Sequence, residues 1–215
     1  SRALEIMPNF VELERYAEYL EGRPGYDRRH REDTEALLAA AVGANFEGGE
    51  AAAFLLDKVI DRVHADGTNS RTVHLLVRIL SEHGARSFAS QTVFYQPGEQ
   101  RAAVRTARVF RAGGGAENAR VHPERRFSRG EQEFAARAVE FPSPAVGDTV
   151  ELEYRIDDLE QGFFGRYFGT TFHFRREMPV LRSRYVLIVP KDLAIHFRTV
   201  SCELRPEVTA DRREG

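Results

Sequence analysis

The stretch from about Leu55 to Val200 is a succession of strand-like segments separated by turn residues, and this pattern limits the possible folds more than any other feature. Short runs rich in β-branched and aromatic residues alternate there with glycine, proline and aspartate. About eight or nine strands with short connections and no interleaved helices favour two antiparallel sheets packed face to face. We therefore predict a mainly β fold, an antiparallel two-sheet β-sandwich with a short N-terminal helical segment.

The expected strands lie at residues 54–63, 72–80, 92–95, 103–110, 134–141, 150–156, 170–175, 181–189 and 193–199. Asp66 and Gly67 predict a tight turn between the first two strands. Residues 81–89 are expected to hold a helical turn, and the polar residues 117–129 are expected to form a loop. In the strand at 150–156 apolar and charged residues alternate, which indicates one buried and one solvated face.

Two helices are expected before the chain divides near residue 48. The first, over residues 10–20, opens on a capping arrangement and carries apolar side chains at helical spacing. The second begins at Asp33 or Thr34 and ends at Gly43. The predicted organisation is a helical segment over residues 1–48, compatible with the end of an upstream helical region, then the sandwich over 49–205 and a C-terminal tail or linker over 206–215.

Composition excludes several classes of partner. The chain has 215 residues, 42% of them hydrophobic, which is enough to bury a core. Its net charge is only −2, so the charge balance requires neither nucleic acid nor an anionic membrane. No apolar run approaches the roughly 20 residues that span a bilayer, and the first residues carry no signal-peptide pattern. We expect no nucleic-acid partner and no membrane span in this chain.

The residue types that usually carry chemistry are not arranged for it. Cys202 is the only cysteine and follows an apolar strand, where a small buried side chain is usual, although a nucleophile paired with His196 is the alternative. The histidines lack the spacing of metal-binding motifs. The run Gly113, Gly114, Gly115 lacks the lysine and the strand-to-helix context of a phosphate loop. We expect no catalytic residue, no metal site and no cofactor.

Glu151 and Glu153 project from one face of the same expected strand, so their side chains begin about 7 Å apart. That distance is near the one at which glycosidases place an acid and a base around a sugar. Arg155 continues the same row, however, and charges on a solvated sheet face produce this pattern without a catalytic role. We favour the solvated face.

One glycine-flanked segment favours binding. Its candidate binding residues are four aromatic side chains and an arginine between them: Phe163, Phe164, Arg166, Tyr167 and Phe168. Adjacent aromatic pairs cannot all point inward from a regular strand. Loops often carry binding residues, and exposed aromatic rings anchor partners or stack on sugars. The alternative is that these rings close the open end of the sandwich.

Several segments match a known pattern in their order and spacing. They are Leu55-Leu56-Asp57, Asp66-Gly67-Thr68 and residues 73–80, 107–109, 141–142, 146–154 and 179–190. Together they resemble a bacterial domain of unknown function that lies immediately N-terminal to a transglutaminase-like core domain. The resemblance covers about residues 51–205. It departs over residues 112–129, where the family has a neat polar hairpin, and before residue 48.

This resemblance implies an all-β sandwich in an exported multidomain protein, located in the periplasm, the cell envelope or outside the cell. It implies a transglutaminase-like domain beyond Gly215 and no catalytic residue in this module. Our first hypothesis is a non-catalytic accessory module that packs against that domain or presents a substrate or partner to it. The second is a carbohydrate- or peptidoglycan-binding module that uses the aromatic loop. The third is an enzyme in its own right.

Overall fold

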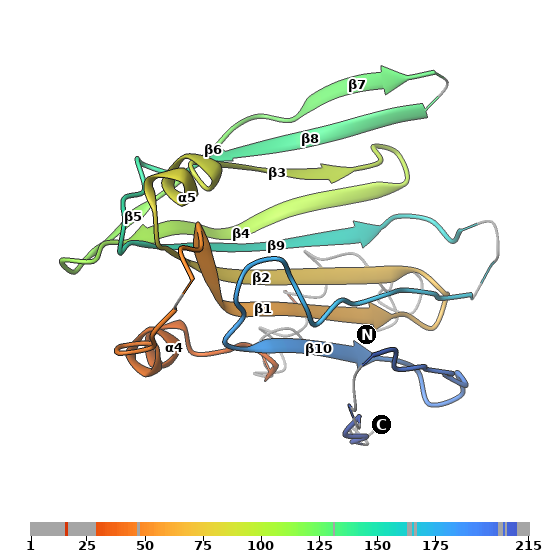
Figure 1. The fold of residues 1–215 in the computed structure, drawn as a ribbon. Helices are drawn as coiled ribbons and strands as arrows, with labels where there is room; N and C mark the ends of the chain where they lie inside the picture. Colours follow the sequence, from red (N-terminus) through yellow and green to blue (C-terminus); the bar gives the residue numbers. More distant parts are fainter. Residues whose placement is uncertain are drawn as a thin grey trace.

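The computed structural model describes residues 16, 29–46, 48–130, 132–162, 165, 167–201, 204 and 206–209. The strands of this part of the chain form a six-stranded sheet, with the order β10-β1-β2-β9-β4-β5, and a smaller sheet, with the order β3-β8-β6, in which β7 also pairs with β8 (Figure 1). The elements are α4 (Thr34–Ala40), β1 (Ala52–Val63), β2 (Asn69–Ile79), α5 (Glu82–Ser87), β3 (Ser90–Tyr95), β4 (Gln100–Phe110), β5 (Ala116–Asn118), β6 (Arg120–Val121), β7 (Arg125–Arg129), β8 (Gln132–Glu140), β9 (Thr149–Asp158) and β10 (Ser183–Ile188).

The prediction of a mainly β, two-sheet fold with a short N-terminal helix is confirmed. Strands β1, β2, β3, β4, β8 and β9 lie where the sequence predicts them, and α5 forms within the predicted helical turn. The tight turn between β1 and β2 is also present, with Gly67 at a φ of 88°. Helix α4 begins as predicted, because the Asp33 side chain accepts hydrogen bonds from the backbone N–H groups of Glu35 and Ala36. Apart from Tyr16, the first predicted helix lies outside the described residues.

The connection from β9 to β10 explains one wrong prediction. β10 is parallel to β1, and β9 points the same way because both β9 and β1 are antiparallel to β2. Residues 167–182 therefore cross β2 and β1 before they enter β10, and Figure 1 shows this segment in front of both strands. The strand predicted at 170–175 is wrong. Its alternating phenylalanines instead reflect packing, with the Phe172 ring 5.3 Å from that of Tyr185 on β10.

Two further predictions are wrong. Residues 193–199 are irregular rather than a strand, so β10 has no hairpin partner there. The loop predicted over residues 117–129 instead contains most of β5 and all of β6 and β7. These short strands pair with β4 and β8, and their side chains are polar and mostly exposed, as is common on sheet edges. Long-range pairing, rather than an apolar pattern, makes this segment extended.

The core between the two sheets uses the apolar row of β9. Val150 and Leu152 are buried, and Tyr154 packs beside them. The smaller sheet contributes Val93 and Tyr95 from β3, with Ala135 and Val139 from β8. Val93 and Tyr95 lie on one face of β3, and Ala135 and Val139 lie on one face of β8, so the residues directly next to each of them point away from the core. The predicted inward face of β9 is thus confirmed.

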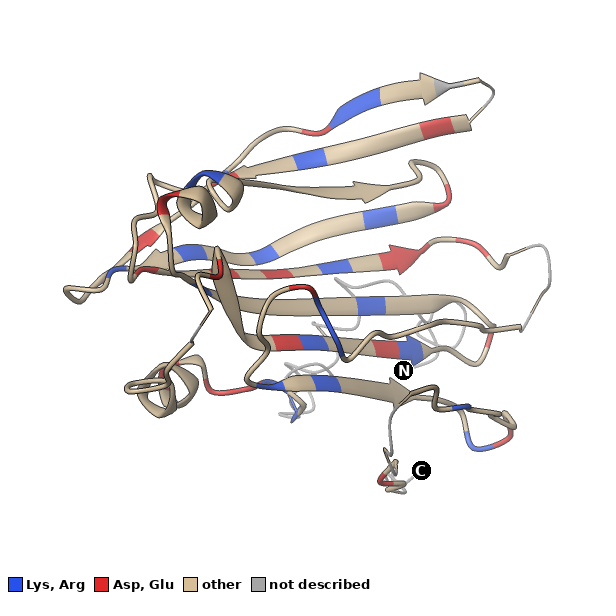
Figure 2. Ribbon diagram, in the orientation of Figure 1, with Lys and Arg blue, Asp and Glu red and all other residues tan. Residues whose placement is uncertain are grey.

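The opposite face of the six-stranded sheet is covered by α4. Leu37, Leu38 and Ala41 of this helical segment pack against Leu56 of β1 and Leu76 of β2. The charged row of β9 points to the same side, where Glu151 is 0% exposed, Glu153 7% and Arg155 2%. The prediction of a solvated face is therefore wrong. Figure 2 shows both acidic and basic residues on β1 and β9, two interior strands of the sheet.

The packing of helix α5 against Ala51 can be tested by a substitution at Gly84. A Cβ atom added at Gly84 would lie 1.9 Å from the backbone carbonyl oxygen of Ala51, which also accepts hydrogen bonds from Leu80 and Ser81. Because that oxygen is held on two sides, Gly84→Ala is expected to lower the free energy of unfolding by about 3 kcal/mol or more, measured by urea denaturation. Gly113→Ala is the control, since nothing lies within 4 Å of its added Cβ. Equal stability of the two variants would contradict the close contact between α5 and residue 51.

Candidate functional site

Glu151 is the best-connected carboxylate of the buried charged row. It accepts hydrogen bonds from Thr34 Oγ1 at 2.6 Å and Arg108 Nε at 2.5 Å, and His74 Nε2 lies 2.9 Å away. Burial raises the pKa of this carboxyl, but the hydrogen bonds from His74, Thr34 and Arg108 more than offset that effect and lower the pKa to about 2. Glu151 therefore stays ionised and ties the start of α4 to β9.

Glu32, just before α4, makes a second link to the sheet. Its carboxylate lies 3.2 Å from Lys58 Nζ on β1, 2.8 Å from Arg184 Nη1 on β10 and 3.2 Å from Arg182 Nη2. Burial alone would raise the pKa of Glu32, but the bond from Arg184 and the charge of Lys58 bring it below the ordinary value. Burial lowers the pKa of Lys58, and Glu32 opposes this shift. The segment before α4 is thus fastened to two strands by charge.

The two glutamates of β9 are buried, so neither carboxylate is accessible to a sugar. Glu151 is occupied by three side chains, and Glu153 is buried, with Arg31 Nε 3.7 Å from its Oε2 atom. Arg155, which continues the row, donates to Asp157 at 2.5 Å. Glu151 and Arg155 are thus hydrogen-bonded within a buried network, whereas the buried Oε2 atom of Glu153 accepts no hydrogen bond from the described residues. These contacts favour a structural role for the row over the acid and base of a glycosidase.

The face of β1 that points away from α4 carries two buried aspartates, Asp57 and Asp61. Arg176 of the crossing segment donates two hydrogen bonds to Asp57, at 2.5 and 2.8 Å. Asp61 accepts two from Arg71, at 2.8 and 2.7 Å, and one from the Tyr185 hydroxyl at 2.9 Å. Burial and the neighbouring Asp61 both raise the pKa of Tyr185. The segment that links β9 to β10 is therefore fixed to β1 by a bidentate ion pair.

The predicted aromatic site is described only in part. Phe163, Phe164 and Arg166 lie outside the described residues. Tyr167 is 74% exposed, and Phe168 is half-buried. The Tyr167 ring lies over Gly169, so closely that a Cβ at that glycine would be 2.8 Å from the tyrosine hydroxyl. The segment thus presents at least one aromatic ring to solvent. This ring lies against Gly169, where a larger side chain would collide with it.

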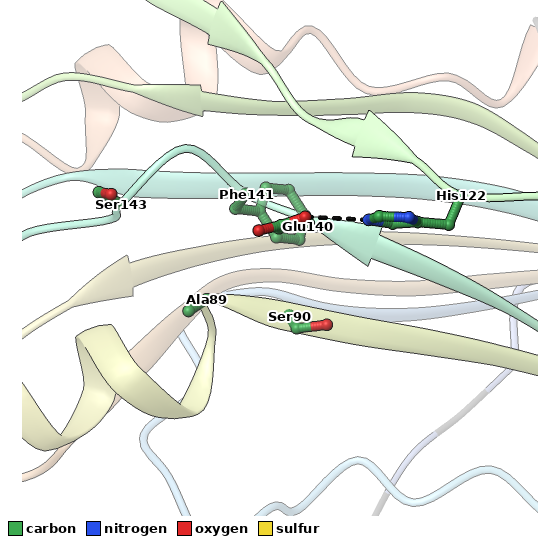
Figure 3. Close-up of a pocket in the computed structure, with 6 residues that line it drawn as sticks. All are labelled: Ala89, Ser90, His122, Glu140, Phe141 and Ser143. Atoms are coloured by element: carbon green, nitrogen blue, oxygen red, sulfur yellow. Dashed lines mark hydrogen bonds and ion pairs between the residues drawn. The ribbon is translucent and has the colours of Figure 1, made fainter.

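A shallow depression of about 380 Å³ contains a histidine and a glutamate that the sequence did not single out together. His122 Nε2 lies 2.9 Å from Glu140 Oε2, and the two side chains point toward one another in Figure 3. Ser90 and Ser143 line the same depression. Neither hydroxyl has a hydrogen bond to His122 among the contacts of the described residues, so the pair lacks the activated nucleophile of a hydrolytic triad. Only the pairing of β6 with β8 brings His122 and Glu140 together.

A second depression, of about 480 Å³, lies between the end of α4 and the glycine run. The run forms a turn, with Gly114 at a φ of 99° and Gly115 at 87°. Arg78 borders the depression, and its Nη1 atom donates to the carbonyl oxygen of Ala41 at 2.9 Å. That contact holds the end of α4 against β2. The walls carry no arrangement of groups that selects a particular ligand.

The segment that follows β10 exposes several apolar side chains. Phe197 is 67% exposed and Val200 68%, while Leu204 is 43% and Val208 88%. Apolar side chains scattered singly on a surface are ordinary, but four along one short segment form a pattern. We name residues 193–209 the C-terminal arm. Among the described residues that follow β10, the large exposed apolar side chains lie on this arm.

No group of three or more His, Cys, Asp or Glu side chains within the described ranges is placed to hold a metal ion. Cys202 lies outside these ranges, so its pairing with His196 is not described. The helices of the described part are too short or too polar to cross a membrane.

The fold has relatives among known proteins. Residues 65–214 match the model of DUF3857, a domain of unknown function with a solved structure. No curated protein matches the chain. A candidate protease from Parabacteroides distasonis has a similar fold, with a TM-score of 0.58 and 14% identity over 66% of this chain. The chain spans only 29% of that protein's length.

A weaker likeness is to carbohydrate-binding modules. A family 3a module from the CipA scaffolding of Clostridium thermocellum has a TM-score of 0.28 and 12% identity, covering 46% of this chain and 72% of the module. A form of the same module with flanking linkers has a TM-score of 0.30 and 11% identity, covering 53% and 71%. Similarity this low carries no conclusion about ligands.

Glu151 makes the stability of the protein depend on pH. Its pKa in the folded protein is about 2, below the ordinary 4.5, so its contribution is complete above about pH 4.5 and is lost as the pH falls toward 2. Glu151→Gln is expected to lower the free energy of unfolding by about 3 kcal/mol at pH 7, with a difference from the parent that shrinks between pH 4.5 and 2. Urea denaturation across this pH range measures both effects.

Glu117→Gln is the matched control, because Glu117 also pairs with an arginine, at 2.6 Å, but its side chain is 55% exposed. Its removal is expected to change stability little at any pH. A Glu151→Gln variant as stable as the parent at pH 7 would show that the buried row does not hold α4 in place.

Proposed function

Because the chain belongs to the DUF3857 family, we propose that it is a non-catalytic accessory module that packs against a transglutaminase-like domain in a longer bacterial protein. In this proposal the sandwich positions that domain or presents a substrate or partner to it. The resemblance of residues 51–205 to modules that precede transglutaminase-like domains is one support. The same resemblance favours a location in the cell envelope or outside the cell.

The observation that carries the proposal is the C-terminal arm. Phe197, Val200, Leu204 and Val208 are uncovered, although burying a large apolar side chain is worth about 1.5–3 kcal/mol. Exposed apolar side chains that recur along one segment favour a contact with another protein surface. A neighbouring domain that packs on the arm would remove this surface from water.

The arrangement of the ionisable groups supports a non-catalytic role. The buried carboxylates Glu151 and Asp61 each accept hydrogen bonds from at least two side chains, and Asp57 accepts two from Arg176. A general acid or base has to reach substrate and exchange a proton with it. The exposed pair His122 and Glu140 meets that requirement, but neither Ser90 nor Ser143, which line the same depression, makes a hydrogen bond to His122 among the described contacts.

The proposal is tested in the longer protein. Replacing Phe197 and Val200 together with serine is expected to weaken the packing of the two domains, because both side chains lose apolar contact area. Scanning calorimetry should then resolve one cooperative transition into two, while the isolated chain keeps its own melting temperature. Val42→Ser is the control, since Val42 is 78% exposed but lies just after α4.

Three results would contradict the proposal. The first is a gene that encodes no transglutaminase-like domain next to this module. The second is identical unfolding of the double variant and the control in the longer protein. The third is a hydrolase or transferase activity of the isolated chain that is lost in Glu153→Gln or Cys202→Ala, which would establish an enzyme instead.

A second candidate function is glycan binding, which the exposed ring of Tyr167 favours. Tyrosine rings stack on the apolar faces of sugars, and this ring is 74% exposed beside a glycine. Titration with chitin oligosaccharides and soluble peptidoglycan fragments is expected to show binding that weakens at least tenfold in Tyr167→Ala. Phe197→Ala, which removes an exposed ring elsewhere, should bind normally. No binding, or equal binding by Tyr167→Ala, would eliminate this candidate.

A further inference from the structure

The outer face of the smaller sheet carries a row of phenylalanines. Val93 and Tyr95 of β3 point into the core, so Phe94 between them points outward. By the same alternation Phe134 of β8 points outward, beside the buried Ala135. Phe127 of β7 lies directly opposite Phe134 in the strand register. We name Phe94, Phe127 and Phe134 the aromatic face.

The three rings are in contact with one another and open to solvent. The ring centres of Phe94 and Phe127 are 6.3 Å apart, and those of Phe127 and Phe134 are 5.7 Å apart. Phe94 is 60% exposed and Phe127 45%. Ala136 and Ala138 continue the outward row of β8, so only small apolar side chains border the rings there. A contiguous apolar patch of this kind is characteristic of an interaction surface.

The orientation of the rings favours a polypeptide over a sugar as the occupant. Phe127 and Phe134 stack with an angle of only 18° between their planes, so each covers a face of the other. Phe94 meets Phe127 at 88°, edge to face. Sugar stacking needs a free ring face and nearby hydrogen-bonding groups, whereas ring edges and methyl groups suit aliphatic side chains. Apolar side chains of a protein segment fit this surface better.

The charges beside the rings favour an acidic occupant. Arg125 lies two residues before Phe127 on β7, so its side chain is on the same face. Arg120 of β6 is opposite Glu140 of β8, at the end of this face. The Glu140 carboxylate is engaged by His122, and neither arginine has an acidic partner among the described residues. A second copy of the face would bring the same unpaired arginines, so a different, acidic partner is favoured.

We propose that the aromatic face, together with Arg120 and Arg125, docks a polypeptide segment that carries aliphatic and acidic side chains. The rings supply the apolar contact, as buried aromatic side chains do at most interaction hot spots. The arginines select carboxylates and set the orientation of the segment. This site is separate from the C-terminal arm, so it stands even if the arm has no neighbouring domain.

The test uses a library of random 12-residue peptides displayed on phage and selected against the intact chain. The enriched peptides are expected to combine aliphatic and acidic residues. As synthetic peptides they should lose at least tenfold in affinity for Phe127→Ser and severalfold for Arg125→Ala, measured by fluorescence anisotropy. Val42→Ser is the control, because that apolar side chain is 78% exposed but lies just after α4, on neither proposed docking surface. Circular dichroism checks that each variant is folded, and Phe94→Ser replaces Phe127→Ser if the latter is not.

Each other outcome would overturn the proposal. One is a selection that enriches no peptide, or peptides that bind Phe127→Ser and Phe94→Ser as tightly as the parent. Self-association in sedimentation equilibrium that Phe127→Ser abolishes would make a second copy the occupant. Retention on insoluble chitin, cellulose or peptidoglycan that is lost in Phe127→Ser would make it a glycan. Enrichment of basic peptides would contradict the role of Arg120 and Arg125.

Discussion

Charged side chains on a strand that is covered on both faces have to find partners inside the protein, because an unpaired buried charge costs several kcal/mol. Strand β1 imposes this requirement. Asp57 and Asp61 are 0% exposed on one face, and Lys58 is 1% exposed on the other. The partners come from separate segments, with Arg176 from the crossing segment and Glu32 from the residues before α4. Charges of β1 therefore help to position both coverings of the six-stranded sheet.

These ion pairs fix an arrangement more than they add stability, since buried pairs often contribute no more than apolar side chains of similar size. A shift of β1 by one residue would exchange the faces of Asp57 and Lys58 and leave both without partners. The bidentate contact of Arg176 and the cluster around Glu32 thus exclude such a register. Both faces of the six-stranded sheet are therefore covered. The uncovered apolar side chains lie instead on the C-terminal arm and on the smaller sheet.

The sequence predicted the geometry of β9 but not its surroundings. Strict alternation from Val150 to Ile156 correctly placed the apolar row toward the core, because side-chain direction depends only on the local backbone. Whether the charged row meets water depends on a segment far away, since Thr34 and Glu151 are separated by 117 positions. The aromatic face was missed for the same reason. Phe94, Phe127 and Phe134 come from three strands, and only the register of the smaller sheet brings them together.

The two uncovered apolar surfaces lie on opposite sides of the molecule. In Figure 1, β7 and β8 form one side, and β10, from which the C-terminal arm leaves, forms the other. The strands between them set a separation on the order of 30 Å, from spacings of about 4.8 Å between strands and about 10 Å between sheets. A segment docked on the aromatic face would need about nine extended residues to reach a domain on the arm. Under the two proposals, only a polypeptide longer than this could contact both surfaces at once.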